Sequence, residues 1–170
     1  MRPAAILGVL TDIELYDRRS AVECGSGNST IFAARLFAQR GRGHITTLEH
    51  EATWAAVTRG LLEEEGLTQW ARVVLAPLID GWYDVTQIPV VDSIDLLVVD
   101  GPPACARETQ EARAPALDWF AHRLTDDATV ILDDAWRRGE RRVITRWSGA
   151  YNRKFRLDAG GFAISAPHVP

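Results

Sequence analysis

Short segments rich in β-branched and other apolar residues alternate along this chain with longer segments of helical periodicity. This order is typical of a mostly parallel sheet whose two faces are covered by helices. Seven segments are expected as strands, namely residues 20–24, 44–49, 72–76, 94–100, 129–133, 154–158 and 162–165. The last two flank Gly160 and Gly161, which predicts an antiparallel β-hairpin at the end of the chain. We therefore expect an α/β fold.

Four helices are expected among these strands. Three are placed at residues 29–40, 104–124 and 139–147, and the fourth follows the second strand and ends at Gly66. The residues expected to share one apolar face of this fourth helix are Trp54, Val57, Leu61 and Leu62. Residues 77–89 show no clear period and are expected to form a loop or a short helix.

Capping residues and proline mark the ends of these helices. Asn28 or Ser29 is expected to cap the helix at residues 29–40, and Gly41 is expected to end it. Pro115 lies inside the segment 104–124, where it is expected to bend the helix.

The composition indicates one domain spanning residues 1–170. With 170 residues, 46% of them hydrophobic, the chain can bury one sizeable core but is too short for two ordinary domains. A charged fraction of 25% and a net charge of -4 do not favour wholesale binding to nucleic acid or to an anionic membrane. No apolar run approaches a membrane span, and Asp12 and Glu14 follow the apolar residues 4–10 too closely for a signal peptide.

Cysteine and lysine are both scarce. Two cysteines, Cys24 and Cys105, are too few for a disulfide framework, so a reducing cytoplasm is the expected location. Lys154 is the only lysine, and it lies near the C-terminus. A mechanism that needs a lysine base or a Schiff base therefore has a single candidate.

The most informative motif follows the first expected strand. Gly25 and Gly27 stand between that strand and a helix, where glycine lets the backbone approach a ligand beside the helix N-terminus. Glu23 precedes the first glycine by two residues, and Glu49 ends the next strand, where a carboxylate can accept both ribose hydroxyls of an adenosine ligand. A tight turn with helix-capping acids is the ordinary alternative. A dinucleotide site is disfavoured because Thr30 stands where its fingerprint has a third small residue.

Four segments, in this order along the chain, resemble the successive motifs of class I S-adenosylmethionine-dependent methyltransferases. They are Glu23-Cys-Gly-Ser-Gly-Asn-Ser-Thr, Thr47-Leu-Glu-His-Glu-Ala-Thr-Trp54, Asp95-Leu-Leu-Val-Val-Asp-Gly-Pro-Pro103 and Val130-Ile-Leu-Asp-Asp134. The resemblance covers nearly the whole chain. It implies a Rossmann-like three-layer sandwich with a mostly parallel seven-stranded sheet and an antiparallel C-terminal hairpin.

The same resemblance implies the cofactor, S-adenosylmethionine, and its contacts. The glycine loop and Glu23 are expected at the methionine end, Glu49 at the ribose, and Asp80 and Gly81, more loosely, near adenine. The full set of expected cofactor contacts is Glu23, Cys24, Gly25, Ser26, Gly27, Asn28, Ser29, Thr30, Glu49, His50 and Asp100.

Three acids, Asp100, Asp133 and Asp134, end two strands that are expected to be neighbours. Clustered carboxylates repel one another unless a positive group lies among them. One solution is Mg²⁺ or another divalent cation, which prefers oxygen ligands and can deprotonate a substrate hydroxyl. A second is that Asp133 or Asp134 is itself the general base, with Asp100 fixing the geometry of the Gly-Pro-Pro turn. A third is a purely structural role for all three acids.

The metal arrangement resembles that of the catechol-type O-methyltransferases, with two departures. Asp134 stands where that family has asparagine, and residues 101–107 contain no lysine where that family has its base. The choice between a metal and a carboxylate base therefore stays open at the level of sequence.

Other polar and aromatic residues near these strand ends carry weaker signals. His122 is expected to be an ordinary surface or packing residue, whereas His50, beside Glu49, is expected either to contact adenosine or to face solvent. The arginine-rich segment 137–142 is expected at the mouth of the site, where it either attracts an acidic substrate or simply begins a solvated helix. Trp136, Trp82 and Tyr83 are expected either to wall the substrate pocket or to pack in the core.

The leading hypothesis is a methyltransferase that uses S-adenosylmethionine to methylate a small molecule, at oxygen. The alternatives are a catalytically silent cofactor-binding subunit and, less favoured, an NAD-dependent oxidoreductase. Because the chain has little sequence beyond the bare fold, a partner chain or a homodimer is a candidate for completing the pocket. The substrate itself is not identified, because loops and added segments determine specificity in such folds.

Overall fold

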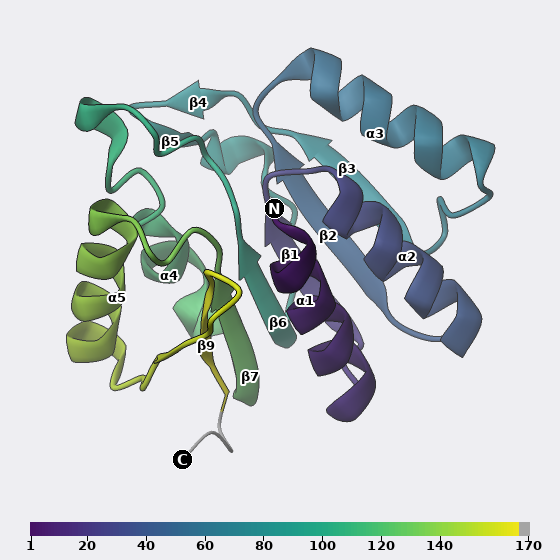
Figure 1. The fold of residues 1–170 in the computed structure, drawn as a ribbon. Coiled ribbons are helices and arrows are strands. Elements are labelled where there is room, and N and C mark those ends of the chain that lie inside the picture. The colour runs from purple at the N-terminus through teal and green to yellow at the C-terminus, as the bar shows by residue number, and fades with distance from the viewer. Residues whose placement is uncertain (167–170) are drawn as a thin grey trace.

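The computed structural model describes residues 1–166 and contains one central seven-stranded sheet (Figure 1). Its strands are β1 (Ser20–Cys24), β2 (His44–Glu49), β3 (Ala71–Leu75), β6 (Ile94–Val99), β7 (Leu124–Leu132), β8 (Arg156–Leu157) and β9 (Ala163–Ser165). They lie in the order β3-β2-β1-β6-β7-β9-β8. Strands β1, β2, β3, β6 and β7 are parallel, whereas β9 is antiparallel to both of its neighbours. The predicted fold, including its C-terminal hairpin, is confirmed.

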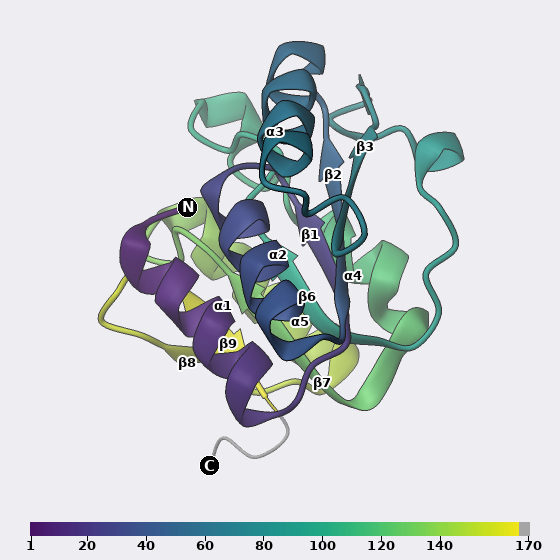
Figure 2. The same ribbon diagram turned by 90° about the vertical axis from the view of Figure 1, so that its right-hand side faces the viewer.

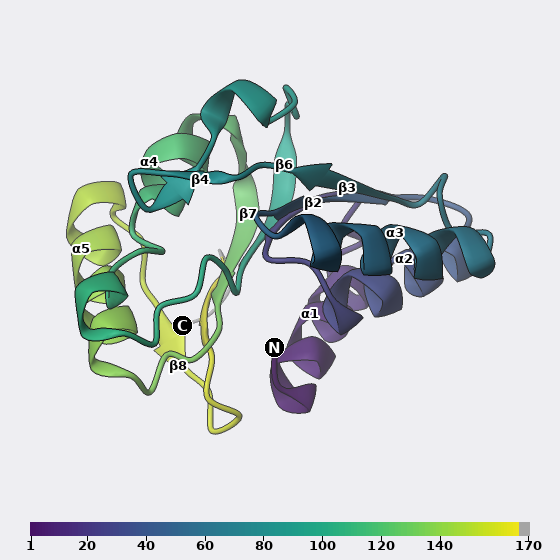
Figure 3. The same cartoon turned by 90° about the horizontal axis from the view of Figure 1, so that it is seen from above.

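Helices cover both faces of this sheet, as Figures 2 and 3 show. One layer consists of α1 (Pro3–Leu15), α2 (Asn28–Arg40) and α3 (Ala52–Glu64), and the other of α4 (Pro115–Phe120) and α5 (Arg138–Tyr151). Each layer buries its own apolar cluster against the sheet, with Phe37 central to the first and Trp147 to the second. No helix of the described chain is long and apolar enough to cross a membrane.

Helix α1 has no counterpart among the elements expected from the sequence. Its buried residues Ala5, Val9 and Ile13 recur every four positions and pack on the first apolar cluster. Leu7 and Leu15, on the opposite side, are largely exposed. The apolar stripe is therefore present in the sequence, but the additional exposed leucines mask its period.

The long helix expected at residues 104–124 does not form. The segment contains a 3₁₀ turn (Arg107–Thr109), further turns, the short helix α4 and a second 3₁₀ turn (Ala121–Arg123). Pro115 is the first residue of α4 rather than a bend within a helix, because a proline has no N–H to donate and fits best at the first helical position. Strand β7 then begins at Leu124, five residues earlier than expected.

Two further expectations need correction. Residues 77–89 contain a small separate hairpin of β4 (Leu78–Ile79) and β5 (Trp82–Tyr83), followed by a 3₁₀ turn (Val85–Gln87). In α3 the buried residues are Ala55, Thr58 and Leu62. The other members of the expected apolar face, Trp54, Val57 and Leu61, are exposed because small residues of this helix face the sheet.

Candidate functional site

The parallel register brings the ends of four strands to one edge of the sheet. Cys24, the last residue of β1, pairs with Leu48 of β2 on one side and with Val99 of β6 on the other. Val99 in turn pairs with Leu132 of β7. The residues that follow these strand ends therefore meet at one edge, which is where open α/β sheets bind their ligands.

The loop after β1 is held against the loop after β6. Gly25 has a φ of +94°, which favours glycine, and a Cβ added there would lie 3.0 Å from the backbone nitrogen of Gly101. The amide nitrogens of Asp100 and Gly101 both donate to the carbonyl oxygen of Cys24. Glycine at position 25 thus permits the close approach that brings Asp100 beside the glycine loop.

Helix α2 begins at Asn28 with Gly27 as its capping residue, so the expected cap at Asn28 or Ser29 is wrong. The physical reason is that the hydroxyl groups of Ser29 and Thr30 point back to the carboxylate of Glu23. Gly41 ends the helix in the left-handed conformation, as expected.

Glu23 lies fully buried beneath the glycine loop. Its carboxylate accepts hydrogen bonds from the hydroxyl groups of Ser29, Thr30 (2.5 Å) and Thr47 (2.9 Å). Burial raises the pKa of Glu23 to about 7, despite these three donors. Glu23 therefore ties β1, β2 and the start of α2 together beneath the loop.

Glu49 lies at the end of β2, next to the glycine loop. One carboxylate oxygen accepts from the backbone nitrogen (3.0 Å) and hydroxyl (2.7 Å) of Ser26, and the other from the backbone nitrogens of His50 and Glu51. The imidazole Nδ1 of His50 is 2.9 Å from the same second oxygen. Although burial acts to raise it, the donors from Glu51 and Ser26 hold the pKa of Glu49 below its ordinary value.

The three acids after β6 and β7 converge as expected. Asp100, Asp133 and Asp134 bring carboxylate oxygens within 4.8 Å of one another. Asp133 is buried, and among the described residues its Oδ1 has no hydrogen-bond partner. Burial and the neighbouring charge of Asp100 raise the pKa of Asp133 to about 6. The carboxylate of Asp133 is therefore the least compensated of the three.

Asp134 and Glu140 extend the acidic cluster toward α5. Asp134 has a φ of +57°, an uncommon conformation for a residue other than glycine, and such strain occurs often at functional sites. Its Oδ2 is 2.9 Å from Nη1 of Arg137, so one arginine of the basic segment pairs inside the cluster. Glu140 is buried, burial raises its pKa, and neither carboxylate oxygen has a hydrogen-bond partner among the described residues.

Arg113 is the residue of this site that the sequence did not reveal. Its side chain is only 4% exposed, and it lies 3.5 Å from carboxylate oxygens of both Asp100 and Asp134. The expected long helix would have displayed Arg113 on its surface, whereas the turns before Pro115 direct it into the cluster. An arginine two residues before a helix-starting proline was the only signal available.

Asp100 also contacts the amino group of Met1, which lies 2.6 Å from its Oδ2. The two oxygens of Asp100 thus face two different cations, the Met1 amine and the Arg113 guanidinium.

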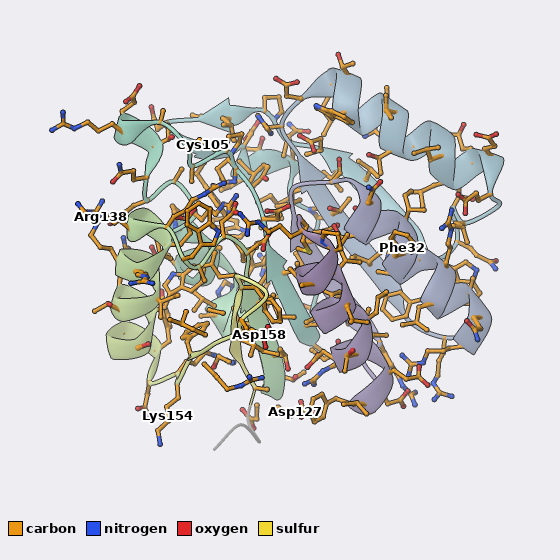
Figure 4. The ribbon with its side chains drawn as sticks, viewed as in Figure 1. Phe32, Cys105, Asp127, Arg138, Lys154 and Asp158 are labelled. Atoms are coloured by element: carbon orange, nitrogen blue, oxygen red, sulfur yellow. The ribbon has the colours of Figure 1, made fainter. Side chains whose placement is uncertain are left out.

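The remaining candidates lie apart from this edge or pack in the core. Trp82 and Tyr83 are buried and His122 is exposed, as the ordinary interpretations predicted, whereas Trp136 is 51% exposed. Lys154 and Asp127 both lie at the lower end of the molecule in Figure 4, opposite Cys105, which follows β6. The single lysine is therefore excluded as a base for the acidic cluster.

Two sizeable cavities lie away from the strand ends. A cavity of about 580 Å³ is lined by Leu124, Thr125 and Lys154, among others, at the start of β7, and one of about 610 Å³ lies between α1 and α2. A small cavity of about 120 Å³ lies closer to the acids, against Ala135 and Trp136. We therefore locate the site by its convergent polar groups and not by cavity size.

Comparison with known proteins identifies the family. A family model described as a methyltransferase domain matches residues 22–135, which include the glycine loop, Glu49 and all three aspartates. No curated protein sequence matches the chain.

Solved methyltransferase structures share the fold. An O-methyltransferase from Bacillus cereus in complex with SAH is 18% identical with a TM-score of 0.72, covering 98% of this chain and 82% of its own. The O-methyltransferase TomG from Streptomyces achromogenes, in complex with SAM, is 18% identical with a TM-score of 0.70, covering 96% and 79%. A methyltransferase from Geobacter sulfurreducens is 16% identical with a TM-score of 0.68, covering 98% and 79%.

Proposed function

The chain belongs to the methyltransferase domain family, and from that premise we propose that it transfers a methyl group from S-adenosylmethionine to an oxygen atom of a small molecule. The observation that carries this proposal is that the glycine loop lies between acidic residues at the ends of the neighbouring strands. Glu49 lies on one side of it, and Asp100 and Asp133 lie on the other, at the ends of neighbouring strands.

We assign the adenosine part of the cofactor to the β1 and β2 side of this edge. Glu49 is kept ionised by its backbone donors, and an ionised carboxylate is a strong acceptor for ribose hydroxyl groups. Gly27, where an added Cβ would meet nothing within 4 Å, leaves the backbone open to close approach before the N-terminus of α2. The reacting end of the cofactor then lies toward Asp100, beside the loop after β6.

The cofactor supplies an electrophilic methyl group on a sulfonium, and the chain must position the acceptor and remove its proton. Asp133 is suited to take that proton, because its Oδ1 has no hydrogen-bond partner in the part of the chain that the structure describes and its carboxylate lies next to Asp100 at the same edge. In-line placement of the acceptor oxygen supplies much of the remaining rate. The acceptor is proposed to be oxygen because this acidic cluster is suited to deprotonating a hydroxyl group.

A divalent cation on Asp100, Asp133 and Asp134 is the second arrangement. Hard cations prefer such oxygen ligands, and the three carboxylates are close enough to share one. Asp100 and Asp134, however, already have a guanidinium 3.5 Å away, and Asp134 has a second at 2.9 Å. Because two of the three ligands are compensated, the set does not fit a metal well, and the proposed mechanism uses no metal.

Calorimetric titration with S-adenosylhomocysteine tests the cofactor assignment. The natural-sequence protein is expected to bind it, and Glu49→Ala is expected to weaken binding by roughly 10- to 100-fold, as for loss of a charged hydrogen-bond acceptor. Glu51→Ala, which changes the exposed acid two residues away, is the matched control and should bind normally. Failure of the natural-sequence protein to bind, or a preference for NADH, would overturn the methyltransferase proposal.

A catalytically silent cofactor-binding subunit is distinguished by turnover. If S-adenosylhomocysteine binds through Glu49 but no methyl group is transferred to any member of a panel of phenols, catechols and hydroxy acids, the silent-subunit interpretation gains support. Transfer to any of them establishes an active enzyme.

A further inference from the structure

Two guanidinium groups lie among the carboxylates of the acidic cluster and offset part of their negative charge without any bound ion. Four carboxylates gather there, those of Asp100, Asp133, Asp134 and Glu140. Arg113 and Arg137 are the two guanidinium groups that contact them, and Arg113 alone reaches three of the four. The four carboxylates keep an excess of negative charge, but a fixed guanidinium already lies beside Asp100, Asp134 and Glu140.

Hydrogen bonds to backbone carbonyls hold Arg113 at the centre of this cluster. Its Nε donates to the carbonyl of Pro102 (3.2 Å), its Nη1 to that of Asp133 (3.1 Å) and its Nη2 to that of Asp100. These acceptors belong to the segments that follow β6 and β7. The guanidinium therefore joins the two strand ends and fixes the distance between their acids.

A guanidinium in this position has the properties that a bound metal would otherwise provide. It carries a positive charge, and its planar fork bonds several oxygens at once. It is also rigid, because three backbone acceptors hold it. A divalent ion placed between Asp100 and Asp134 would face this fixed positive charge at short range.

We propose that Arg113 is a built-in cation that takes the place of a divalent metal, so that methyl transfer at this site is metal-independent. Arg113 acts as a positioning residue, because it holds Asp100 and Asp134 and leaves Asp133 free for the acceptor hydroxyl. The inference rests on the proposed methyltransferase function for its biological meaning. Its test does not require a known substrate.

The test measures Mn²⁺ binding by electron paramagnetic resonance, on EDTA-treated protein saturated with S-adenosylhomocysteine. Little binding is expected for the natural sequence at Mn²⁺ concentrations up to about 1 mM, because the guanidinium repels the ion. Arg113→Gln removes that charge and is expected to bind Mn²⁺ at least about tenfold more tightly. Arg138→Gln makes the same change on an exposed arginine nearby, and should leave Mn²⁺ binding unchanged.

If Arg113→Gln does not fold, Mn²⁺ binding is compared between Arg113→Lys and the natural-sequence protein instead. Lysine retains the charge, so this variant should still exclude Mn²⁺, and thermal unfolding with circular dichroism verifies its structure. Micromolar Mn²⁺ binding by the natural-sequence protein that Asp133→Asn abolishes would overturn the inference. So would a folded Arg113→Gln with no gain in Mn²⁺ affinity. Binding of S-adenosylhomocysteine is measured first. A failure of the cofactor proposal is therefore distinguished from a failure of the proposal about Arg113.

Discussion

Two buried arginines lie at opposite ends of the same sheet, and they differ in how fully the acids around them are hydrogen-bonded. At the starting end of the parallel strands, Arg18 bonds Asp12 (2.9 Å), the Thr129 hydroxyl (2.6 Å) and the carbonyl of Asp127 (2.9 Å). Thr129 also donates to the other oxygen of Asp12. At the carboxyl end, Arg113 faces an excess of acids, and within residues 1–166 the carboxylate oxygens of Glu140 and Oδ1 of Asp133 have no hydrogen-bond partner.

This difference in hydrogen bonding distinguishes a structural ion pair, at Arg18, from the proposed active site, at Arg113. Buried polar groups are normally satisfied, and the Arg18 network follows that rule with one arginine and one fully bonded acid. Acids left without partners next to a cation are a cost to stability that a purely structural network has no reason to keep. The unpartnered oxygens at the Arg113 end therefore mark the edge where substrate is expected to react.

The largest effect is expected at Asp133, which lies at the Arg113 end. Asp133→Asn keeps the shape of the side chain but cannot accept a proton, so kcat for an accepted hydroxyl substrate should fall by roughly 10²- to 10⁴-fold. The affinity for S-adenosylhomocysteine should stay the same, and steady-state kinetics with calorimetry measures both. Asp126→Asn, an exposed acid near the start of β7, is the control. Unchanged kcat in Asp133→Asn would remove Asp133 as the base.

A stability effect of comparable free energy is expected at Arg18. Arg18→Met leaves Asp12 buried without its partner, so the free energy of unfolding in urea should fall by about 3–5 kcal/mol. The double variant Arg18→Met with Asp12→Leu should recover most of that loss, because replacing both partners of a buried pair is often nearly neutral. Weakened binding of S-adenosylhomocysteine in the folded double variant would contradict a purely structural role.

A smaller, pH-dependent effect is expected at Glu23, which is fully bonded like Asp12 but lies at the ligand-binding edge. Its pKa is about 7 when folded and near 4.5 ordinarily, so the folded state binds the proton more tightly. The contribution of Glu23 to stability is thus present below pH 4.5 and lost as the pH rises through 7. Glu23→Gln should remove up to about 3 kcal/mol of this decline between pH 5 and 8, measured by urea unfolding. If the free energy of unfolding of Glu23→Gln falls just as steeply over this pH range, the decline is caused by other groups.

Local patterns in the sequence predicted much of the fold and most of the residues at the site. Strands 20–24 and 44–49 match β1 and β2 residue for residue, because apolar runs bounded by turn residues define both ends. Asp100 and Asp133 were expected together because parallel strands in register carry the residues that follow them to the same edge.

The remaining features depend on contacts that no local pattern encodes. Arg113 lies in turns whose shape depends on backbone carbonyls far along the chain, including that of Asp133, so a helical period gave the wrong surroundings. Asn28 or Ser29 was expected to cap α2, yet the hydroxyl of Ser29 donates to the buried Glu23 carboxylate and Gly27 is the capping residue. The exposed face of α3 was mistaken for its buried face because the large apolar side chain of Trp54 outweighs the smaller Ala55 and Thr58, which are buried.

A crystal structure of the protein grown with S-adenosylhomocysteine and Mn²⁺ tests the whole account most directly. We predict that the ribose hydroxyls lie on Glu49, that the sulfur faces Asp100 and Asp133 across the Gly25 loop, and that the Arg113 guanidinium remains among the acids with no Mn²⁺ between them. S-adenosylhomocysteine bound elsewhere, for example between α1 and α2, would contradict the proposed site. Mn²⁺ on the three aspartates with Arg113 displaced would contradict the built-in cation.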